Sequence, residues 1–450
     1  MKFIIAGAGS VGYDIARHLI KEGMDVVIIE KDTVRAKFLE SDLDCIVLNR
    51  EINSIQTLKD ADIQAGDYFI AVTESDEVNL IACSIASTFE NVKKIARVRN
   101  LEYSHAEVFG RPFLGADYVI SPEIEAAKQI TEIIDRGAAT DVLTFEGTDI
   151  TVRAGIIEKN SIFKNKSLMK IRREINRQFI IALIKRGDKE IIPSGNTVLR
   201  EGDTIFIVAD SEAMNYILAK TGKRALKVKS ALIVGTTRIA RNLLRTLSVK
   251  PIDLKIVVEN YDEAKELSRT FPNVLVINGD VRNESLFEEE KLNEVDLIVT
   301  VTDNQELNVI TALYAKSTGV DRAVAAVSRQ SYMSIAQKLG VDVTISPKKS
   351  AVDAILKYIR RGNIKTFHSL LEGDAEAIEF VVPEKCVAVG KLIRELKMPF
   401  DSIIAAISRN GKVFIPDGSF QLQKEDSIIV ILKSSVASKV ETIFANTNEI

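Results

Sequence analysis

The chain has 450 residues, more than a single hydrophobic core usually organises, so we expect several folding units. Lys and Arg number 60 against 63 Asp and Glu, and the formal net charge of -3 provides no positive field that would hold nucleic acid. Hydrophobic residues make up 46% and charged residues 27%, which is typical of a soluble protein that folds throughout.

The cysteines, the histidines and the apolar runs exclude further classes. The three Cys and three His show no metal-ligand spacing, so we expect neither a metal site nor a disulfide framework. Apolar runs such as residues 428–432 have the length of strands and are too short to cross a bilayer. We therefore expect a cytoplasmic protein that reaches a membrane only through a partner.

The first predicted elements are a strand, a glycine-rich turn and a helix. Residues 2–6 form an apolar strand, and Gly7-x-Gly9-x-x-Gly12 opens a helix with a regular apolar face. In this order the glycines permit a tight turn, and the backbone N–H groups at the helix N-terminus can hold a pyrophosphate. The residues expected to contact the phosphates are Gly7, Gly9, Ser10, Val11 and Gly12. The alternative is a glycine-rich turn that binds no ligand.

Glu30 ends the second predicted strand, about 20 residues after the glycines. A carboxylate at this position can accept hydrogen bonds from both hydroxyl groups of a ribose. It therefore favours an adenine ribose that carries no 2′-phosphate.

Two more expected ligand contacts follow later strands. Thr73 comes after the fourth strand, at the carboxyl edge where doubly wound sheets bind ligands, so we expect it beside the ribose or the phosphates. A role for Thr73 or Ser75 as a helix N-cap is the alternative. Arg97 and Arg99 alternate at the end of the next strand, and we expect Arg99 to face the phosphate.

The sequence then repeats itself. The segment that begins at Gly235 aligns with the segment that begins at Gly7, 228 positions earlier, and Thr302 aligns with Thr73. A unit that is duplicated in one chain often derives from one that formed homodimers, so we expect the two halves to pack against each other as a pseudo-dimer.

The second copy departs from the first at the expected phosphate site. Thr237 and Ala240 replace the second and third glycines, and their side chains would crowd a pyrophosphate. Glu259 still ends the second strand of this half, so an adenosine-type ligand remains open, with a purely structural role as the alternative.

We expect an α/β protein built from two kinds of folding unit. Residues 1–137 and 228–362 are predicted to form doubly wound parallel sheets of the Rossmann type, because strands and helices alternate along them. Residues 140–222 and 365–450 are strand-rich and short, and we expect each to form a small α+β module after its sheet.

The motifs and their order carry a resemblance to a known family. They are Gly7-x-Gly9-x-x-Gly12, Glu30, Ala71-Val72-Thr73-x-x-Asp76-Glu77-x-Asn79, Ile95-Ala96-Arg97-Val98-Arg99 and Ser121-Pro122, followed by a small module and then repeated. In this the chain resembles the TrkA family, the peripheral subunits of Trk potassium uptake systems, over nearly its whole length. It departs from the family at Asn49-Arg50-Glu51, where many relatives have Gly-Asp, although the second half keeps Gly279-Asp280.

The resemblance implies a regulatory protein and not an enzyme. The family's unit is the RCK domain, a nucleotide-binding lobe with a C-terminal lobe, and such domains form a homo-oligomeric ring beneath a potassium-conducting membrane subunit. A dimer or a tetramer of this chain would complete the ring, on the inner face of the cell membrane. NAD(H) or ATP and ADP would be its regulatory ligands, with Gly7, Gly9, Gly12 and Glu30 as implied contacts.

Two other functions are alternatives. An NAD-dependent oxidoreductase needs an acid/base group beside the nicotinamide, whereas the small modules offer scattered charges and no catalytic His, so we expect no catalytic residue. The second alternative is a nucleotide sensor that forms the same kind of ring but has no membrane partner. Co-purification with a membrane protein would separate it from the subunit of a transporter.

Overall fold

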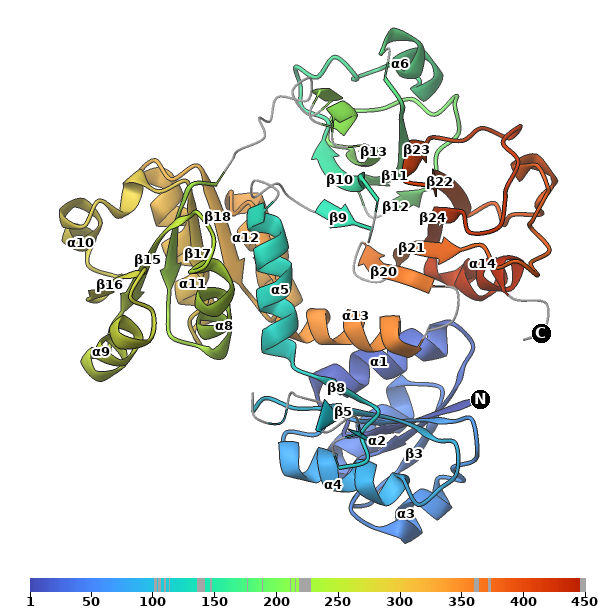
Figure 1. The fold of residues 1–450 in the computed structure, drawn as a ribbon, viewed down its shortest axis with the longest axis horizontal. Coiled ribbons are helices and arrows are strands. Elements are labelled where there is room, and N and C mark those ends of the chain that lie inside the picture. The colour runs from blue at the N-terminus through green and yellow to red at the C-terminus, as the bar shows by residue number, and fades with distance from the viewer. Residues whose placement is uncertain are drawn as a thin grey trace. The chain divides into compact units, whose positions relative to one another are not determined.

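The computed structural model (Figure 1) describes residues 1–100, 103, 107–108, 111–112, 114–135, 142–145, 148–175, 177–187, 189–210, 212–214, 216–217, 228–359, 364–370 and 374–445. Contacts divide the chain into two units. The first comprises Met1–Ile20, Met24–Ala139 and Leu226–Ile355, and the second comprises Lys21–Gly23, Thr140–Ala225 and Leu356–Ile450. In the described part of the chain, no helix has the length and apolar character needed to span a membrane.

The first unit contains two parallel sheets with the same topology. The first sheet has the order β3-β2-β1-β4-β5-β8, so the order in which strands are added to the sheet reverses between β1 and β4. Its strands are β1 (Lys2–Ala6), β2 (Asp25–Ile29), β3 (Ile46–Leu48), β4 (Tyr68–Ala71), β5 (Lys93–Arg97) and β8 (Tyr118–Ile120). Its helices are α1 (Ser10–Lys21), α2 (Thr33–Asp42), α3 (Ile55–Asp60) and α4 (Asp76–Ala86), and a short ribbon pairs β6 (Glu107–Val108) with β7 (Arg111–Pro112).

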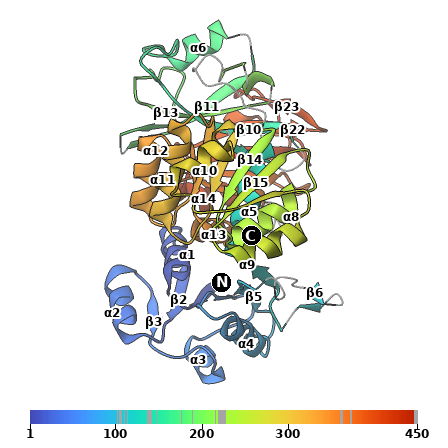
Figure 2. The same cartoon turned by 90° about the vertical axis from the view of Figure 1, so that its left-hand side faces the viewer.

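The second sheet repeats this order as β16-β15-β14-β17-β18-β19. Its strands are β14 (Ser230–Val234), β15 (Asp253–Val258), β16 (Leu275–Asn278), β17 (Leu297–Thr300), β18 (Arg322–Ala326) and β19 (Val343–Ile345). Its helices are α8 (Arg238–Leu247), α9 (Tyr261–Thr270), α10 (Glu284–Glu289), η2 (Leu292–Glu294), α11 (Gln305–Ser317) and α12 (Gln330–Leu339). One core cluster contains side chains from α8 and α9 and a second contains side chains from α10, α11 and α12, and Figure 2 shows α8 and α11 on opposite sides of the sheet.

Helix α5 (Pro122–Asp135) follows the first sheet but packs in the core of the second half. Its Ala126, Ile130 and Ile134 are buried in the same cluster as Leu243 and Leu247 of α8. Burying one such Ile stabilises a fold by roughly 1.5–3 kcal/mol. The contact between halves that the repeat predicted is therefore present, and it is made by a helix of one half inside the core of the other.

Helix α13 (Pro347–Ile359), which follows the second sheet, contacts helices of the first half. Lys348 forms an ion pair of 2.8 Å with Asp14 of α1, and the Ser350 hydroxyl donates a hydrogen bond of 2.8 Å to Gln129 of α5. Figure 1 shows α13 running between α5 and α1. The helices that end the two sheets thus both contact the other half of the first unit.

The second unit contains two antiparallel sheets that also repeat, in the orders β12-β11-β13-β10-β9 and β20-β21-β24-β22-β23. The first module has β9 (Val142–Thr144), β10 (Ile150–Ile156), α6 (Leu168–Glu174), β11 (Phe179–Arg186), β12 (Lys189–Ile191) and β13 (Thr204–Asp210). The second has β20 (Ile364–Leu370), β21 (Ala375–Val381), η4 (Ile393–Glu395), β22 (Ser402–Arg409), β23 (Lys412–Phe414), β24 (Ser427–Lys433), η5 (Ser434–Val436) and α14 (Ala437–Phe444). One apolar cluster joins both sheets. The predicted fold class, two doubly wound sheets each followed by a small α+β module, is confirmed.

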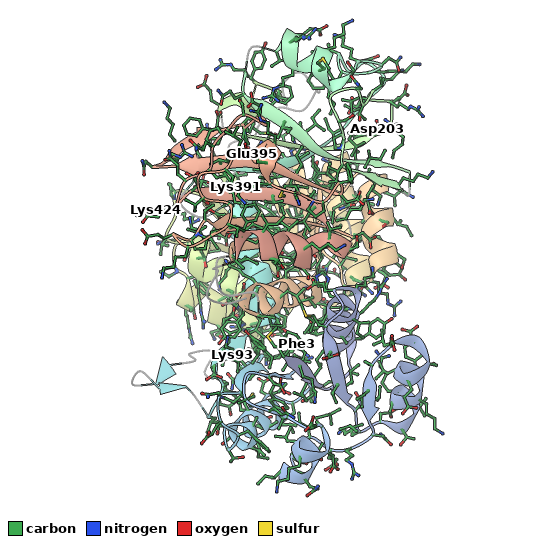
Figure 3. The ribbon with its side chains drawn as sticks, turned by 90° about the vertical axis from the view of Figure 1, so that its right-hand side faces the viewer. Phe3, Lys93, Asp203, Lys391, Glu395 and Lys424 are labelled. Carbon is green, nitrogen blue, oxygen red and sulfur yellow. The ribbon has the colours of Figure 1, made fainter. Side chains whose placement is uncertain are left out.

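An ion pair between a partly exposed arginine and a buried aspartate occupies equivalent positions in the two modules. Nε and Nη2 of Arg186 each lie 2.8 Å from a carboxylate oxygen of Asp203, and Arg409 holds Asp426 at 2.6 and 2.7 Å. Asp203, labelled in Figure 3, is 1% exposed. Burial raises the pKa of Asp203, but hydrogen bonds from Arg186 and from the Arg200 N–H outweigh it, and the pKa lies below its usual value.

We expect Asp203→Asn to lower the free energy of unfolding by about 3 kcal/mol at neutral pH, because it leaves a guanidinium without its buried partner. A carboxylate whose pKa is depressed in the folded state stabilises the fold above its unfolded-state pKa of about 4, and this stabilisation is lost as the pH falls through the folded-state pKa. Urea unfolding at neutral and acidic pH should therefore show a smaller difference between variant and parent in acid. Glu212→Gln, which removes an exposed partner of Arg177, is the control and should change little. Equal effects of the two substitutions would contradict the prediction.

Candidate functional site

Two glycines of the first loop are required by the fold itself. Gly7 follows β1 with φ at +91°, a conformation that favours glycine, and a Cβ there would lie 2.8–3.0 Å from atoms of Thr73. A Cβ on Gly12 would lie 2.0 Å from the Gly7 carbonyl oxygen. The absence of both side chains lets α1 begin directly against the turn that follows β1.

Gly9 differs, because a Cβ at this position would meet no heavy atom within 4 Å. The missing side chain therefore leaves open space at the N-terminus of α1, which begins at Ser10. Ser10 is exposed and Val11 is buried. Backbone N–H groups of a helix's first turn have no partner inside the helix, so this space is suited to an anion such as a pyrophosphate.

Glu30 lies at the end of β2 and is tied to the glycine loop. Its Oε2 accepts a hydrogen bond of 2.8 Å from the Ala8 N–H, and its Oε1 accepts one of 2.9 Å from the Asp32 N–H. An ionised carboxylate has about four lone-pair positions, so Glu30 keeps capacity for two ribose hydroxyls. The side chain that was predicted to hold the ribose thus already fixes the position of the loop beneath it.

Arg35 is a loop contact that the sequence analysis missed. Its Nε donates a hydrogen bond of 2.9 Å to the Ala8 carbonyl oxygen, and its guanidinium lies 5.8 and 5.5 Å from the ring centroids of Tyr13 and Phe38. Asp32 holds α2 in place for this contact by accepting a hydrogen bond from the Arg35 N–H at 2.7 Å. The available signal was a basic residue in the first turn of the helix that follows the ribose-binding acid.

Thr73 and Asn79 form a clamp at the carboxyl edge of the first sheet. The Thr73 N–H and hydroxyl donate to Asn79 Oδ1 at 2.8 and 2.7 Å, and Asn79 Nδ2 donates to the Arg97 carbonyl oxygen at 2.8 Å. Thr302 and Asn308 repeat the clamp in the second half. Thr73 therefore uses its hydroxyl proton inside the protein and can offer a ligand only its oxygen lone pairs.

The N-cap of α4 is Ser75, whose hydroxyl accepts from the Val78 N–H at 3.2 Å. This is the capping role that the sequence left open between Thr73 and Ser75.

The two arginines at the end of β5 face different surroundings. Arg97 lies beside the Thr73 carbonyl oxygen, 3.5 Å from its Nη1, and burial, followed by the charge of Arg99, lowers the pKa of Arg97. Arg99 lines a hollow of about 720 Å³ that it shares with Thr237 and Arg238 of the second half. Its backbone is fixed by Asp76, whose Oδ2 accepts the Arg99 N–H at 2.8 Å.

The corresponding loop of the second half keeps the turn and loses the open space. Gly235 has φ at +107°, but Thr237 stands where Gly9 stands in the first half, and its hydroxyl donates to the Val301 carbonyl oxygen at 2.6 Å. Glu259 follows β15 and forms an exposed ion pair with Arg282 at 3.2 Å. A hollow of about 630 Å³ lies at this edge of the sheet.

The structure thus gathers most of the predicted site residues at one edge. Gly7, Gly9, Ser10, Gly12, Glu30 and Thr73 lie together at the carboxyl ends of β1, β2 and β4. Arg99 faces the hollow shared with the second half, and Glu259 lies at the equivalent edge of the second sheet.

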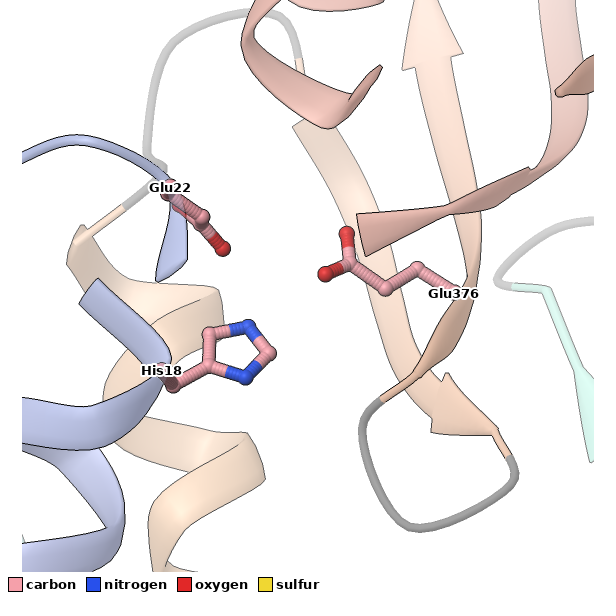
Figure 4. Close-up of side chains that lie close together, drawn as sticks. All are labelled: His18, Glu22 and Glu376. Atoms are coloured by element: carbon pink, nitrogen blue, oxygen red, sulfur yellow. The ribbon is translucent and has the colours of Figure 1, made fainter. Parts of the chain in front are cut away.

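Figure 4 shows His18 of α1, Glu22, which follows α1, and Glu376 of β21. Their side chains are of the types that ligate metal ions. His18 belongs to the first unit and Glu376 to the second, and we infer no metal site from them.

Comparison with known families matches both halves. The TrkA-N domain family matches residues 3–122 and 231–347, and the TrkA-C domain family matches residues 156–222 and 377–445. Each sheet thus corresponds to one TrkA-N domain and each small module to one TrkA-C domain.

Full-length relatives and solved structures agree with this assignment. The chain is 30% identical to "Trk system potassium uptake protein TrkA homolog 1" of Methanosarcina mazei, covering 99% of this chain and 100% of that one. It is 29% identical to "Trk system potassium uptake protein TrkA" of Vibrio alginolyticus, with 99% and 98% covered. The GsuK RCK domain superposes with a TM-score of 0.56 at 16% identity, covering 98% of this chain and 94% of that chain. A GsuK channel bound to NAD gives a TM-score of 0.55 at 15% identity, with 98% and 78% covered.

The loop geometry predicts that only one of two Gly→Ala substitutions lowers stability. Gly12→Ala should lower the free energy of unfolding by about 2 kcal/mol or more, because its Cβ would force α1 away from the Gly7 carbonyl oxygen. Gly9→Ala places its methyl group in open space and should leave stability nearly unchanged. Thermal unfolding of both variants tests this, and equal destabilisation would show that the loop is packed differently.

Proposed function

Because the chain belongs to the TrkA family over both of its halves, we propose that it is the regulatory nucleotide-binding subunit of a Trk-type potassium uptake system. The observation that carries the proposal is the open space at Gly9, which lies at the N-terminus of α1 and beside the Glu30 carboxylate. In doubly wound sheets this edge, at the reversal of strand order, is where dinucleotides bind.

In the proposed complex, the phosphates lie over the backbone N–H groups of residues 9–12 and the adenine ribose lies on Glu30. Thr73 contributes an acceptor oxygen beside them, and Arg97 or Arg99 supplies positive charge. The ligand is NAD(H) or the pair ATP and ADP. The GsuK channel bound to NAD has a similar fold, and this supports the choice of ligands to be tested first.

The proposed role is binding that changes conformation, without catalysis. Glu30 accepts hydrogen bonds from both the Ala8 and the Asp32 N–H groups. A ribose that hydrogen-bonds to this carboxylate would therefore affect the loop before α1 and the start of α2 together. A ligand shifts an equilibrium between two conformations by no more than its difference in affinity for them. A homo-oligomeric ring of these chains would pass that shift to a potassium-conducting membrane subunit, which would hold it at the inner face of the membrane.

We expect Gly9→Asp to abolish nucleotide binding, because its carboxylate would occupy the phosphate space and repel the phosphates. Calorimetric titration of the full chain with NADH, NAD, ATP and ADP measures this. Thr237→Asp adds the same charge at the equivalent position of the second loop and serves as the matched control. If Gly9→Asp bound these nucleotides as tightly as the parent, the site would not be at this loop.

Glu30→Gln should weaken NADH binding by roughly 10-fold or more and reduce the preference for NADH over NADPH, since the repulsion between Glu30 and a 2′-phosphate is removed. Competition titrations with the two dinucleotides give the ratio of affinities. An unchanged ratio would place the ribose away from Glu30.

Potassium flux through the membrane subunit is the test of the regulatory role itself. Flux in vesicles that hold the membrane subunit and this chain should respond to the nucleotide that binds, and Gly9→Asp should remove that response while the chain still associates with the vesicles. A response that survives Gly9→Asp would contradict the proposed link between this site and transport.

A further inference from the structure

The second half keeps the part of the pocket that holds a nucleoside. Its hollow of about 630 Å³ opens at the ends of β14, β15, β16 and β17. Val257, Val281 and Leu307 supply apolar walls that suit a flat base, and Glu259 stands at the end of β15 where Glu30 stands at the end of β2. The Glu259 side chain is 74% exposed and its ion pair with Arg282 is at the surface, so the carboxylate is accessible to a ribose.

The same half lacks two basic side chains that stand near the expected phosphate site of the first half. Ala326 and Ser328 stand where the alignment of Thr302 with Thr73 places Arg97 and Arg99, so two positive charges are missing. Of the residues that line this hollow in the described part of the chain, none is Lys or Arg, whereas four are acidic. They are Glu259, Glu263, Asp280 and Asp303. Arg282 pairs with Glu259 and Asp280 from outside this lining, and the carboxylates of Glu263 and Asp303 oppose the entry of a phosphate.

A divide separates this hollow from the neighbouring one of about 720 Å³. Both hollows are lined by Thr236, Thr237, Thr302 and Asp303. The Thr237 side chain is held at the divide by its hydrogen bond to the Val301 carbonyl oxygen. Arg99 and Arg238 lie beyond it, in a hollow that also contains Glu123, Asp303 and Glu306. Thr237 and Asp303 line both hollows, whereas Arg99 and Arg238 line the larger one alone, so phosphates on a nucleoside in the smaller hollow would meet Thr237 and Asp303 first.

We propose that the second half binds a purine nucleoside with a free ribose and no phosphate, with Glu259 on the ribose hydroxyls and Thr237 and Asp303 excluding phosphorylated forms. This site is distinct from the nucleotide site of the first half and goes beyond the regulatory function proposed above. The first half of the chain would then bind a nucleotide, and the second half would bind a nucleoside without phosphate.

The test is calorimetric titration of the full chain with adenosine, AMP and ADP. Gly9→Asp combined with Glu30→Gln, called the Gly9→Asp chain below, removes both the phosphate space and the ribose contact of the first site. The Gly9→Asp chain should bind about one adenosine and should bind AMP and ADP at least about tenfold more weakly. Adding Glu259→Gln should weaken adenosine by about tenfold or more, as expected for the loss of hydrogen bonds to a charged acceptor. Because Glu259 is exposed, this substitution should leave the thermal unfolding temperature unchanged, which separates a binding effect from misfolding.

A second experiment tests whether ADP binding can be gained in the second half. In the Gly9→Asp chain, Thr237→Gly with Asp303→Asn should open the divide and bring ADP affinity up to that of adenosine. The proposal is overturned if the Gly9→Asp chain binds no adenosine, if it binds ADP as tightly as adenosine, or if Glu259→Gln leaves adenosine binding unchanged. These outcomes do not bear on the first half, whose failure would appear as absent NADH and ATP binding to the parent chain.

Discussion

The approach of α1 to the turn after β1 sets the geometry on which the candidate site depends. A Cβ on Gly12 would come within 2.0 Å of the Gly7 carbonyl oxygen, and a Cβ on Gly7 would meet Thr73. With both side chains absent, the first turn of α1 faces the carboxyl edge of the sheet. Glu30 then reaches the loop, because its carboxylate accepts the Ala8 N–H from the neighbouring strand end. Of these three glycines, only Gly9 could carry a side chain without a clash inside the protein. The space beside Gly9 is therefore available to a ligand, whereas Gly7 and Gly12 are required by the fold.

Much of this could be predicted from the sequence, because the relevant signals are local or periodic. The spacing of Gly7, Gly9 and Gly12 after an apolar strand predicts a strand, turn and helix, and Glu30 follows at the distance that one more strand requires. The repeat predicted the second sheet and the second module in the same way. These signals lie within one βαβ unit, where chain length limits where each residue can be.

The parts that could not be predicted depend on contacts between segments far apart in the sequence. The apolar face of α5 indicates that the helix is buried, but not that Ile130 and Ile134 lie in the core of the second half. The surroundings of Arg99 follow from that contact, since the hollow it lines belongs largely to residues beyond 235. Arg35 was missed because its contact with the Ala8 carbonyl oxygen depends on how α2 is capped.

The contacts that α5 and α13 make with the opposite halves have a consequence for assembly. In two separate copies of a single half, forming these contacts would be a bimolecular step, and the fraction assembled would fall on dilution. Within one chain the two halves meet at an effective concentration set by their covalent connection, commonly in the millimolar range. The first unit is therefore expected to remain paired at any expression level of the cell, and each half can diverge in its ligand without having to preserve a symmetric interface with an identical copy.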